Sequence, residues 1–158
     1  MFSVRPVRLP DDLKLVGRLL REYAADLRVA QCSEDFEAEL ADLASSYTGP
    51  GSELLVVVGR DDCPIGCVAI RRLADTVAEM KRLYLAPEGR GAGLGKQLVV
   101  AAIEAARRLG YCSIRLDTLP GQTAAQGIYR SLGFVAIGPY RHNPVEGTRY
   151  LELSLSSQ

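Results

Sequence analysis

The sequence predicts an α+β fold in which helices cover both faces of one mixed sheet. Two observations favour this class: short apolar runs typical of strands fill the middle of the chain, and amphipathic helical patterns lie before, between and after them. At 158 residues, 47% of them hydrophobic, the chain can bury one core but is short for two, and it contains no repeat or linker. We therefore expect one domain over residues 1–158.

The N-terminal part of the chain is expected to form a strand over residues 2–9 and then two helices. Residues 10–12, Pro-Asp-Asp, supply a helix start signal, and apolar residues then recur at helical spacing. These apolar residues are Leu13, Val16, Leu19, Leu20, Tyr23 and Leu27. A second helix should begin at Ser33 and end before the Gly- and Pro-containing loop at 48–51. Its apolar face would carry Phe36, Leu40 and Leu43.

The centre of the chain alternates apolar runs with turns. Residues 54–58 and 65–73 flank the turn-like segment 60–64, which predicts a hairpin, and a third strand is expected at 76–85. Apolar residues recur at every third or fourth position from 93 to 109, which predicts a helix that Gly110 can end. The remaining elements are then a strand at 113–117, a helix at 124–132 stopped by Gly133, and strands at 134–137 and 148–155.

Composition limits the classes of partner. Nineteen basic and nineteen acidic side chains cancel, so no overall field draws the chain to nucleic acid or to an anionic membrane. The start shows no basic leader followed by an apolar stretch, and no run reaches the roughly 18 apolar residues that span a bilayer. We therefore expect a cytoplasmic protein that binds neither nucleic acid nor membranes.

The cysteines show no metal-binding pattern. Cys32, Cys63, Cys67 and Cys112 have no C-x-x-C spacing, and the single histidine, His142, is far from them in the sequence. We expect reduced cysteines and no metal site.

The segment 90–96, Arg-Gly-Ala-Gly-Leu-Gly-Lys, joins an expected strand to an expected helix. Glycines let the backbone N–H groups approach a ligand, and the helix N-terminus adds positive potential, so the segment is typical of a pyrophosphate cradle. The same glycines can simply serve a tight turn. Two nucleotide-binding motifs fit this segment poorly. The dinucleotide fingerprint is G-x-G-x-x-G, whereas the spacing here is G-x-G-x-G, and Gln97 stands where a P-loop has Ser or Thr.

A second motif follows about 35 residues later, in which Ala125, Tyr129 and Gly133-Phe134 recur at intervals of four. The two motifs in this order resemble the GNAT superfamily of N-acetyltransferases, most closely a bacterial subgroup without an assigned acceptor. The resemblance implies a mixed, mostly antiparallel sheet, acetyl-CoA as the cosubstrate, and transfer of an acetyl group to a primary amine of a small molecule or protein. Many relatives form homodimers.

The resemblance also implies a cofactor-binding surface. Backbone groups of Leu83 and Leu85 would pair with the pantetheine amides, and the N–H groups of residues 91–96 would hold the pyrophosphate. Gln122 stands where the family often has Asn. The implied cofactor residues are Leu83, Tyr84, Leu85, Arg90, Gly91, Ala92, Gly93, Leu94, Gly95, Lys96 and Gln122.

Two residues are candidates for the chemistry. Glu79 lies where several GNAT members keep a glutamate that removes the amine proton, often through water, and its alternative is a structural carboxylate. Tyr129 would protonate the departing thiolate, and its alternative is a core aromatic. Residues expected to border the acceptor site are Tyr23, Tyr140 and Asn143.

Two rival functions follow from the same residues. One is a non-catalytic acyl-CoA sensor that keeps the cradle, and the presence of both Glu79 and Tyr129 favours the enzyme over it. The other is a nucleotide-binding domain, which the loop spacing disfavours. The acceptor amine is not specified by these motifs, because selectivity resides in loops.

Overall fold

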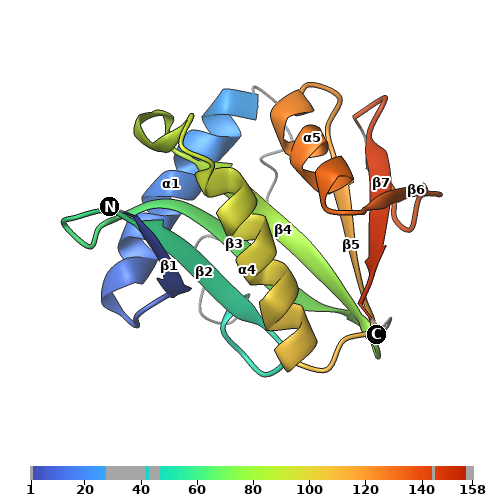
Figure 1. Ribbon diagram of the computed structural model, residues 1–158, viewed down its shortest axis with the longest axis horizontal. Coiled ribbons are helices and arrows are strands. Elements are labelled where there is room, and N and C mark those ends of the chain that lie inside the picture. Colours follow the sequence, from blue (N-terminus) through green and yellow to red (C-terminus); the bar gives the residue numbers. More distant parts are fainter. Residues whose placement is uncertain (1, 28–41, 43–46, 144, 156–158) are drawn as a thin grey trace.

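The computed structural model describes residues 2–27, 42, 47–143 and 145–155. The described strands form one mixed, mostly antiparallel sheet of seven strands in the order β1-β2-β3-β4-β5-β7-β6, and β4 and β5 form its parallel pair (Figure 1). This architecture is the expected α+β class. The helix expected from residue 33 lies outside the described residues, apart from positions 42 and 47.

The described elements follow the expected order. The strands are β1 (Ser3–Pro6), β2 (Glu53–Val58), β3 (Pro64–Ala74), β4 (Val77–Leu85), β5 (Ser113–Thr118), β6 (Val135–Ile137) and β7 (Arg149–Ser154). The helices are α1 (Asp11–Leu27), the short 3-10 helix η1 (Pro87–Gly89), α4 (Leu94–Arg108) and α5 (Thr123–Ser131). Most boundaries lie within one or two residues of the expected ones. The first strand begins one residue later and ends three residues earlier than the expected 2–9, because the backbone turns into α1 from residue 8 onward.

Two apolar clusters fill the space on the two sides of the sheet. Under α4, Leu98 and Ala102 pack with side chains such as Ile70 of β3, and α5 adds Tyr129 to the same cluster. On the other face, α1 packs Val16 and Leu20 onto a second cluster. Strand residues therefore alternate between the two clusters, as the period of two requires. The expected placement of helices on both faces is confirmed (Figure 1).

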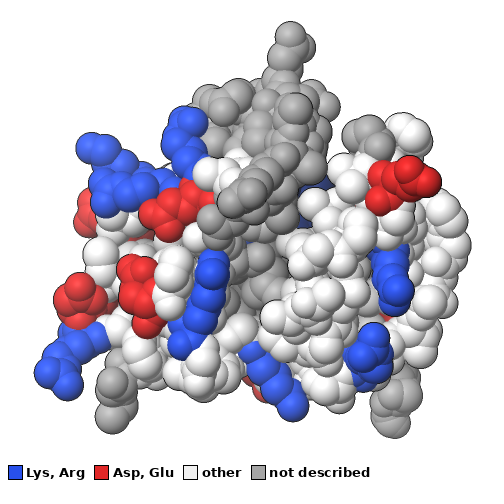
Figure 2. All heavy atoms as spheres, turned by 90° about the horizontal axis from the view of Figure 1, so that it is seen from above, with Lys and Arg blue, Asp and Glu red and all other residues white. Residues whose placement is uncertain are grey.

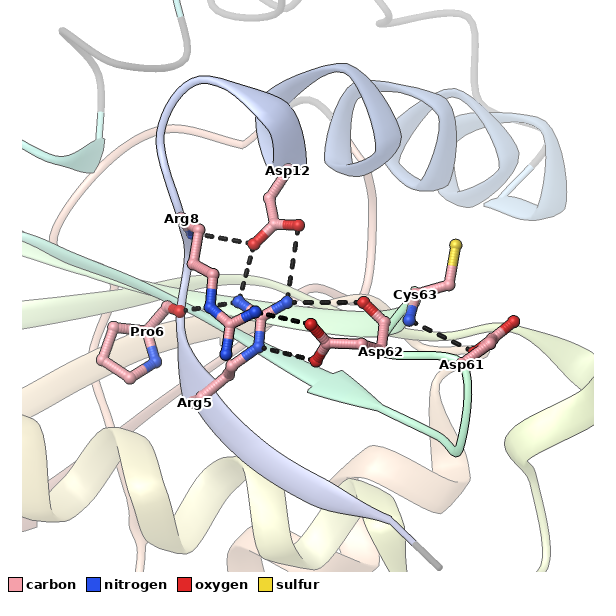
Figure 3. Close-up of polar contacts among 7 residues, drawn as sticks. All are labelled: Arg5, Pro6, Arg8, Asp12, Asp61, Asp62 and Cys63. Atoms are coloured by element: carbon pink, nitrogen blue, oxygen red, sulfur yellow. Dashed lines mark hydrogen bonds and ion pairs between the residues drawn. The ribbon is translucent and has the colours of Figure 1, made fainter.

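An ion-pair network joins β1 to the start of α1 (Figure 3). Asp12 is 5% exposed, and its Oδ2 accepts a hydrogen bond from Arg5 Nη1 at 2.6 Å and from the Arg8 backbone N–H at 2.8 Å. Asp62, in the turn between β2 and β3, accepts from Arg5 Nε at 3.3 Å and from Arg8 Nη1 at 2.5 Å. The Asp12 side chain thus turns back to the strand and fixes the entry of the chain into α1.

Asp12→Asn should destabilise the fold by about 1–3 kcal/mol at pH 7, because a charge-assisted hydrogen bond is lost in a buried position. The hydrogen bond from Arg5 holds the pKa of Asp12 below its usual value. A lowered pKa gives stabilisation that is complete above the unfolded-state pKa of about 3.9 and disappears as the pH falls through the folded-state pKa. Urea unfolding should therefore show that the difference in free energy of unfolding between the parent and this variant becomes smaller below about pH 4. Asp11→Asn, at the exposed neighbouring position, is the control. A difference in free energy of unfolding that stays constant with pH would contradict the stabilising role of the Asp12 charge.

The strands β4 and β5 separate part-way along the sheet. Their parallel pairing ends at Glu79 opposite Arg115, although β4 continues to residue 85 and β5 to residue 118. Figure 1 shows the two strands close together at one end and apart near α5. Just beyond the last pair, β4 carries a bulge at Arg82, whose φ is 62°. Bulges re-aim strands next to functional sites, and here the bulge lies where the strands diverge.

Charged side chains are interspersed over the face of the molecule seen in Figure 2, and no continuous patch of one sign spans it. Within the part of the chain that the structure describes, no helix is both long and apolar enough to cross a membrane.

Candidate functional site

A pocket of about 460 Å³ lies at the end of β4, between the start of α4 and the start of α5. Its wall is built from four elements: the last residues of β4, the glycine loop, one face of α5 and Tyr23 of α1. The lining residues are Tyr23, Leu83, Tyr84, Leu85, Arg90, Gly91, Gly93, Leu94, Gly95, Lys96, Gln122, Ala124, Ala125 and Ile128.

The glycine loop presents open backbone to this pocket. Gly91 and Gly93 have φ values of 89° and 76°, and no atom lies within 4 Å of the position that a Cβ would take at either residue. Gly93 is the N-cap of α4 and offers no side chain to its first-turn N–H groups, which have no partner inside the helix. Exposed N–H groups at a helix N-terminus, with Lys96 beside them, form an anion site. The residues therefore fit the pyrophosphate of a CoA thioester.

Gly95 has a different role in the same loop. A Cβ on Gly95 would lie 3.1 Å from Cδ1 of Ile128, so this glycine allows α4 and α5 to approach closely. That approach brings the apolar face of α5 to the pocket. Ala124 and Ile128 line the pocket although sequence reasoning did not select them, whereas Ala92, which it did select, is not a lining residue. The helical spacing of Ala124, Ala125 and Ile128 was the sequence feature that could have indicated their common face.

Arg90 folds back over the end of β4. Its Nε donates a hydrogen bond to the Leu85 carbonyl oxygen at 2.9 Å, and its guanidinium lies 5.7 Å from the centre of the Tyr84 ring. The Leu85 carbonyl, which the family resemblance assigns to pantetheine, therefore already accepts one hydrogen bond. A carbonyl oxygen has two lone pairs, so a second donor can still bind it.

Gln122 is the N-cap residue of α5. Its Oε1 accepts hydrogen bonds from the Leu119 backbone N–H at 2.8 Å and from Thr118 Oγ1 at 3.2 Å. The carbonyl end of this amide thus fixes the loop between β5 and α5. The residue also lines the pocket, where its side chain interacts with the hydroxyl of Tyr23.

Tyr129 is 6% exposed and its ring packs against Phe134, with ring centres 5.5 Å apart. Its hydroxyl makes no hydrogen bond to any residue that the structure describes. Burial raises the pKa of Tyr129, and the nearby Tyr23 and Asp117 raise it further. The phenol is therefore a protonated donor without an acceptor among the described residues. Tyr129 is not itself a lining residue, although Ala125 and Ile128 of the same helix are.

Glu79 is fully buried at the point where β4 and β5 part. Arg71 of β3 donates to Oε1 from Nε and Nη2, each at 3.2 Å. The Tyr140 hydroxyl donates to Oε2 at 2.8 Å, and Arg141 Nη2 donates to the same oxygen. Both carboxylate oxygens are therefore engaged. This geometry favours a role for Glu79 in holding residues 140 and 141 against β4.

Lys81 was not selected from the sequence. It lies two residues after Glu79 on β4, is half-buried, and makes no hydrogen bond or ion pair with a described residue. Burial lowers the pKa of Lys81 to about 8, and the Arg82 charge acts in the same direction. An amine with this pKa is partly neutral near physiological pH and can accept a proton. In the sequence, Lys81 could have been selected because it lies two residues from Glu79 on the same strand.

The expected acceptor residues are divided between two places. Tyr23 lines the pocket, and burial raises its pKa. Tyr140 and Asn143 do not line it. Tyr140 is bound to Glu79, and Asn143 Nδ2 donates to Asp117 Oδ2 at 3.3 Å. His142 is exposed.

Known proteins share this fold and sequence pattern. The sequence pattern of the acetyltransferase (GNAT) family matches residues 18–134. An uncharacterized N-acetyltransferase of Schizosaccharomyces pombe is 36% identical over 156 residues, which cover 98% of this chain and 96% of that protein. Human N-acetyltransferase 8B is 32% identical over 105 residues, covering 63% of this chain but only 46% of the human protein.

Solved structures of low sequence identity have the same fold. A GNAT phosphinothricin acetyltransferase from Sinorhizobium meliloti, in complex with acetyl-CoA, aligns with a TM-score of 0.81 at 22% identity, covering 98% of this chain and 88% of that one. An acetyltransferase from Streptococcus agalactiae aligns with a TM-score of 0.81 at 18% identity over 98% of both chains. The family pattern covers well over half of the chain and the S. pombe relative matches it end to end. The chain therefore belongs to the GNAT family of acetyl-CoA-dependent N-acetyltransferases.

Proposed function

We propose that the chain acetylates a primary amine, with the cosubstrate held between the glycine loop and the end of β4 and with Tyr129 as the general acid. The observation that carries the proposal is the arrangement of the loop. Gly91 and Gly93 leave open space over the free N–H groups of α4, and this space joins a pocket bordered by the helix that carries Tyr129. Glycines placed only for a turn would need no such pocket.

Acetyl-CoA supplies the acetyl group as a thioester, whose C–S bond is exchanged for a C–N bond. The protein then has two proton transfers to manage. Tyr129 donates its hydroxyl proton to the departing thiolate, and the raised pKa of this phenol keeps the proton available at neutral pH. The acceptor amine gives up one proton in becoming an amide. Solvent later restores the proton of Tyr129.

Two groups of β4 are candidates to take the amine proton. Glu79 is the one that the family resemblance implies, but three side chains already donate to its oxygens. Lys81 has no hydrogen-bond or ion-pair partner in the part of the chain that the structure describes, and its pKa of about 8 suits exchange of protons with an alkylamine. We assign proton removal to Lys81 and positioning of Tyr140 and Arg141 to Glu79.

Calorimetric titration with acetyl-CoA, NAD and ATP tests the binding half of the proposal. We expect acetyl-CoA alone to bind. A spectrophotometric assay of CoA release against a panel of primary amines then tests the chemistry. Binding without release of CoA for any amine would favour the acyl-CoA sensor over the enzyme.

Glu79→Gln should lower kcat by about tenfold while changing acetyl-CoA affinity by less than about twofold, because the amide keeps the shape but cannot hold two guanidinium groups. If Glu79 positions Tyr140 and Arg141, kcat should fall by the same factor at every pH. The measurement is kcat from pH 6 to pH 9. A loss that grows as the pH falls would instead support the role of base. Glu152→Gln is the matched control, since Glu152 pairs with Arg115 at 2.8 Å on the next strands of the sheet.

A further inference from the structure

The pocket has walls from both faces of the sheet. Ala125 and Ile128 of α5 line it, and both pack against the apolar cluster under α4. Tyr23 and Tyr84 also line it, and they belong to or pack against the cluster under α1, on the opposite face. The backbone pairing of β4 with β5 has already ended at Glu79, before the part of β4 that lines the pocket. The pocket therefore reaches from one face to the other where the two strands have separated.

Tyr23 closes this pocket from the side of α1. It follows Val16 and Leu20 at helical spacing, and both of those side chains are fully buried against the sheet. Tyr23 continues the same row near the end of α1, where part of its surface faces the pocket and the residue is only half-buried. The first residues of α4, which hold the glycine loop, lie on the opposite face of the sheet. The Tyr23 ring and the N–H groups of α4 thus stand at opposite ends of the pocket.

The Tyr23 ring is held from behind by a second aromatic side chain. Its centre lies 5.8 Å from that of the Tyr84 ring, with the two planes inclined at 68°, which is an edge-to-face contact. Tyr84 is itself 7% exposed, and its hydroxyl donates to Glu22 Oε1 at 3.5 Å. Because close-packed interiors resist displacement, a ligand cannot easily push the Tyr23 ring back.

We propose that the Tyr23 ring is the end wall of the acyl part of the pocket and restricts the donor to CoA thioesters with a short acyl chain. This inference rests on the proposed function, in which the glycine loop holds the pyrophosphate and Tyr129 serves the sulfur. An acyl group on that sulfur extends away from the pyrophosphate and therefore toward Tyr23. The two phenols are close enough for Tyr23 to raise the pKa of Tyr129. A longer acyl chain would have to displace the ring from its contact with Tyr84.

The test measures, by calorimetry, the dissociation constants of acetyl-CoA and butyryl-CoA for the parent and for Tyr23→Ala. In the parent, butyryl-CoA should bind more weakly than acetyl-CoA. Loss of the ring from an apolar wall leaves a cavity that an apolar group can fill, and each methylene buried there strengthens binding by about fourfold. The ratio of the butyryl-CoA to the acetyl-CoA dissociation constant should therefore fall by at least about tenfold in Tyr23→Ala. Tyr23→Leu, a milder change that keeps the helix face apolar, should lower the ratio in part.

Two control variants separate the wall from other effects. Tyr23→Phe keeps the ring and should keep the ratio of the parent. Ile128→Ala enlarges the same pocket beside Gly95, at the glycine-loop end, and should change both affinities by the same factor. An unchanged ratio in folded Tyr23→Ala or Tyr23→Leu protein, or an equal fall in Ile128→Ala, would overturn the proposal.

The outcome for Tyr23 is independent of turnover, because binding of the thioester needs no acceptor. A parent that binds acetyl-CoA but releases CoA with no amine would contradict the proposed function, and the ratio of dissociation constants would still decide whether Tyr23 limits the acyl chain. A parent that binds neither thioester would overturn both proposals.

Discussion

Tyr129→Phe should lower kcat by about 10²-fold or more, in the range of a lost general acid, while KM for acetyl-CoA stays the same. The substitution removes one oxygen that makes no hydrogen bond to a described residue, and the ring keeps its contact with Phe134 at 5.5 Å. The free energy of unfolding should therefore hardly change. Steady-state kinetics and urea unfolding of the same preparation measure both quantities.

The matched control is another buried tyrosine, Tyr111, whose hydroxyl donates to the Gly51 carbonyl oxygen at 2.6 Å. Tyr111→Phe should lose about 1 kcal/mol of stability and retain its turnover, the reverse of Tyr129→Phe. Full activity in Tyr129→Phe would make this hydroxyl a bystander in the core. A thioester with a thiol of lower pKa should partly restore the variant, since a better leaving group needs less protonation.

Gly93→Val should weaken acetyl-CoA binding by at least about 10²-fold. Residue 93 has φ of 76°, a conformation that a β-branched residue adopts only with strain, and the added side chain would project into the open space over the N-terminus of α4. Isothermal titration calorimetry measures the affinity directly.

A substitution at a second glycine can separate the backbone strain caused by valine from the obstruction of the acetyl-CoA site. Gly110 has φ of 92° and the same open surroundings, but it ends α4 at the opposite end from the pocket. Gly110→Val should lose stability and keep its affinity for acetyl-CoA. Unchanged affinity in a folded Gly93→Val protein would instead remove residues 90–96 from the binding site.

The parts of the site that sequence predicts well are local. The glycines at 91, 93 and 95 and the first residues of α4 are neighbours in the chain, so their spacing alone indicates a cradle, and all but Ala92 of the expected cofactor residues line the pocket. Element types were predictable for the same reason, because the apolar period is set within a few residues.

The surroundings of the chemistry were not predictable from one sequence. Glu79 meets Arg71 across a hairpin, but its other partners, Tyr140 and Arg141, are about 60 residues away in the chain. The sequence of β4 alone does not predict partners so distant in the chain. The burial of Lys81 depends in the same way on which strands lie side by side.

The separation of β4 and β5 leaves the sheet with few backbone pairings at its centre. In the described chain, three residue pairs join β4 to β5, whereas six join β5 to β7. The sheet therefore has two parts, β1 to β4 and β5 to β6, which are joined by a short paired segment that ends at Glu79. This carboxylate belongs to the first part, and Tyr140 and Arg141, which it binds, lie between β6 and β7 of the second. The buried ion pair between Glu79 and Arg141 thus connects the two parts of the sheet at the point where their backbone pairing ends.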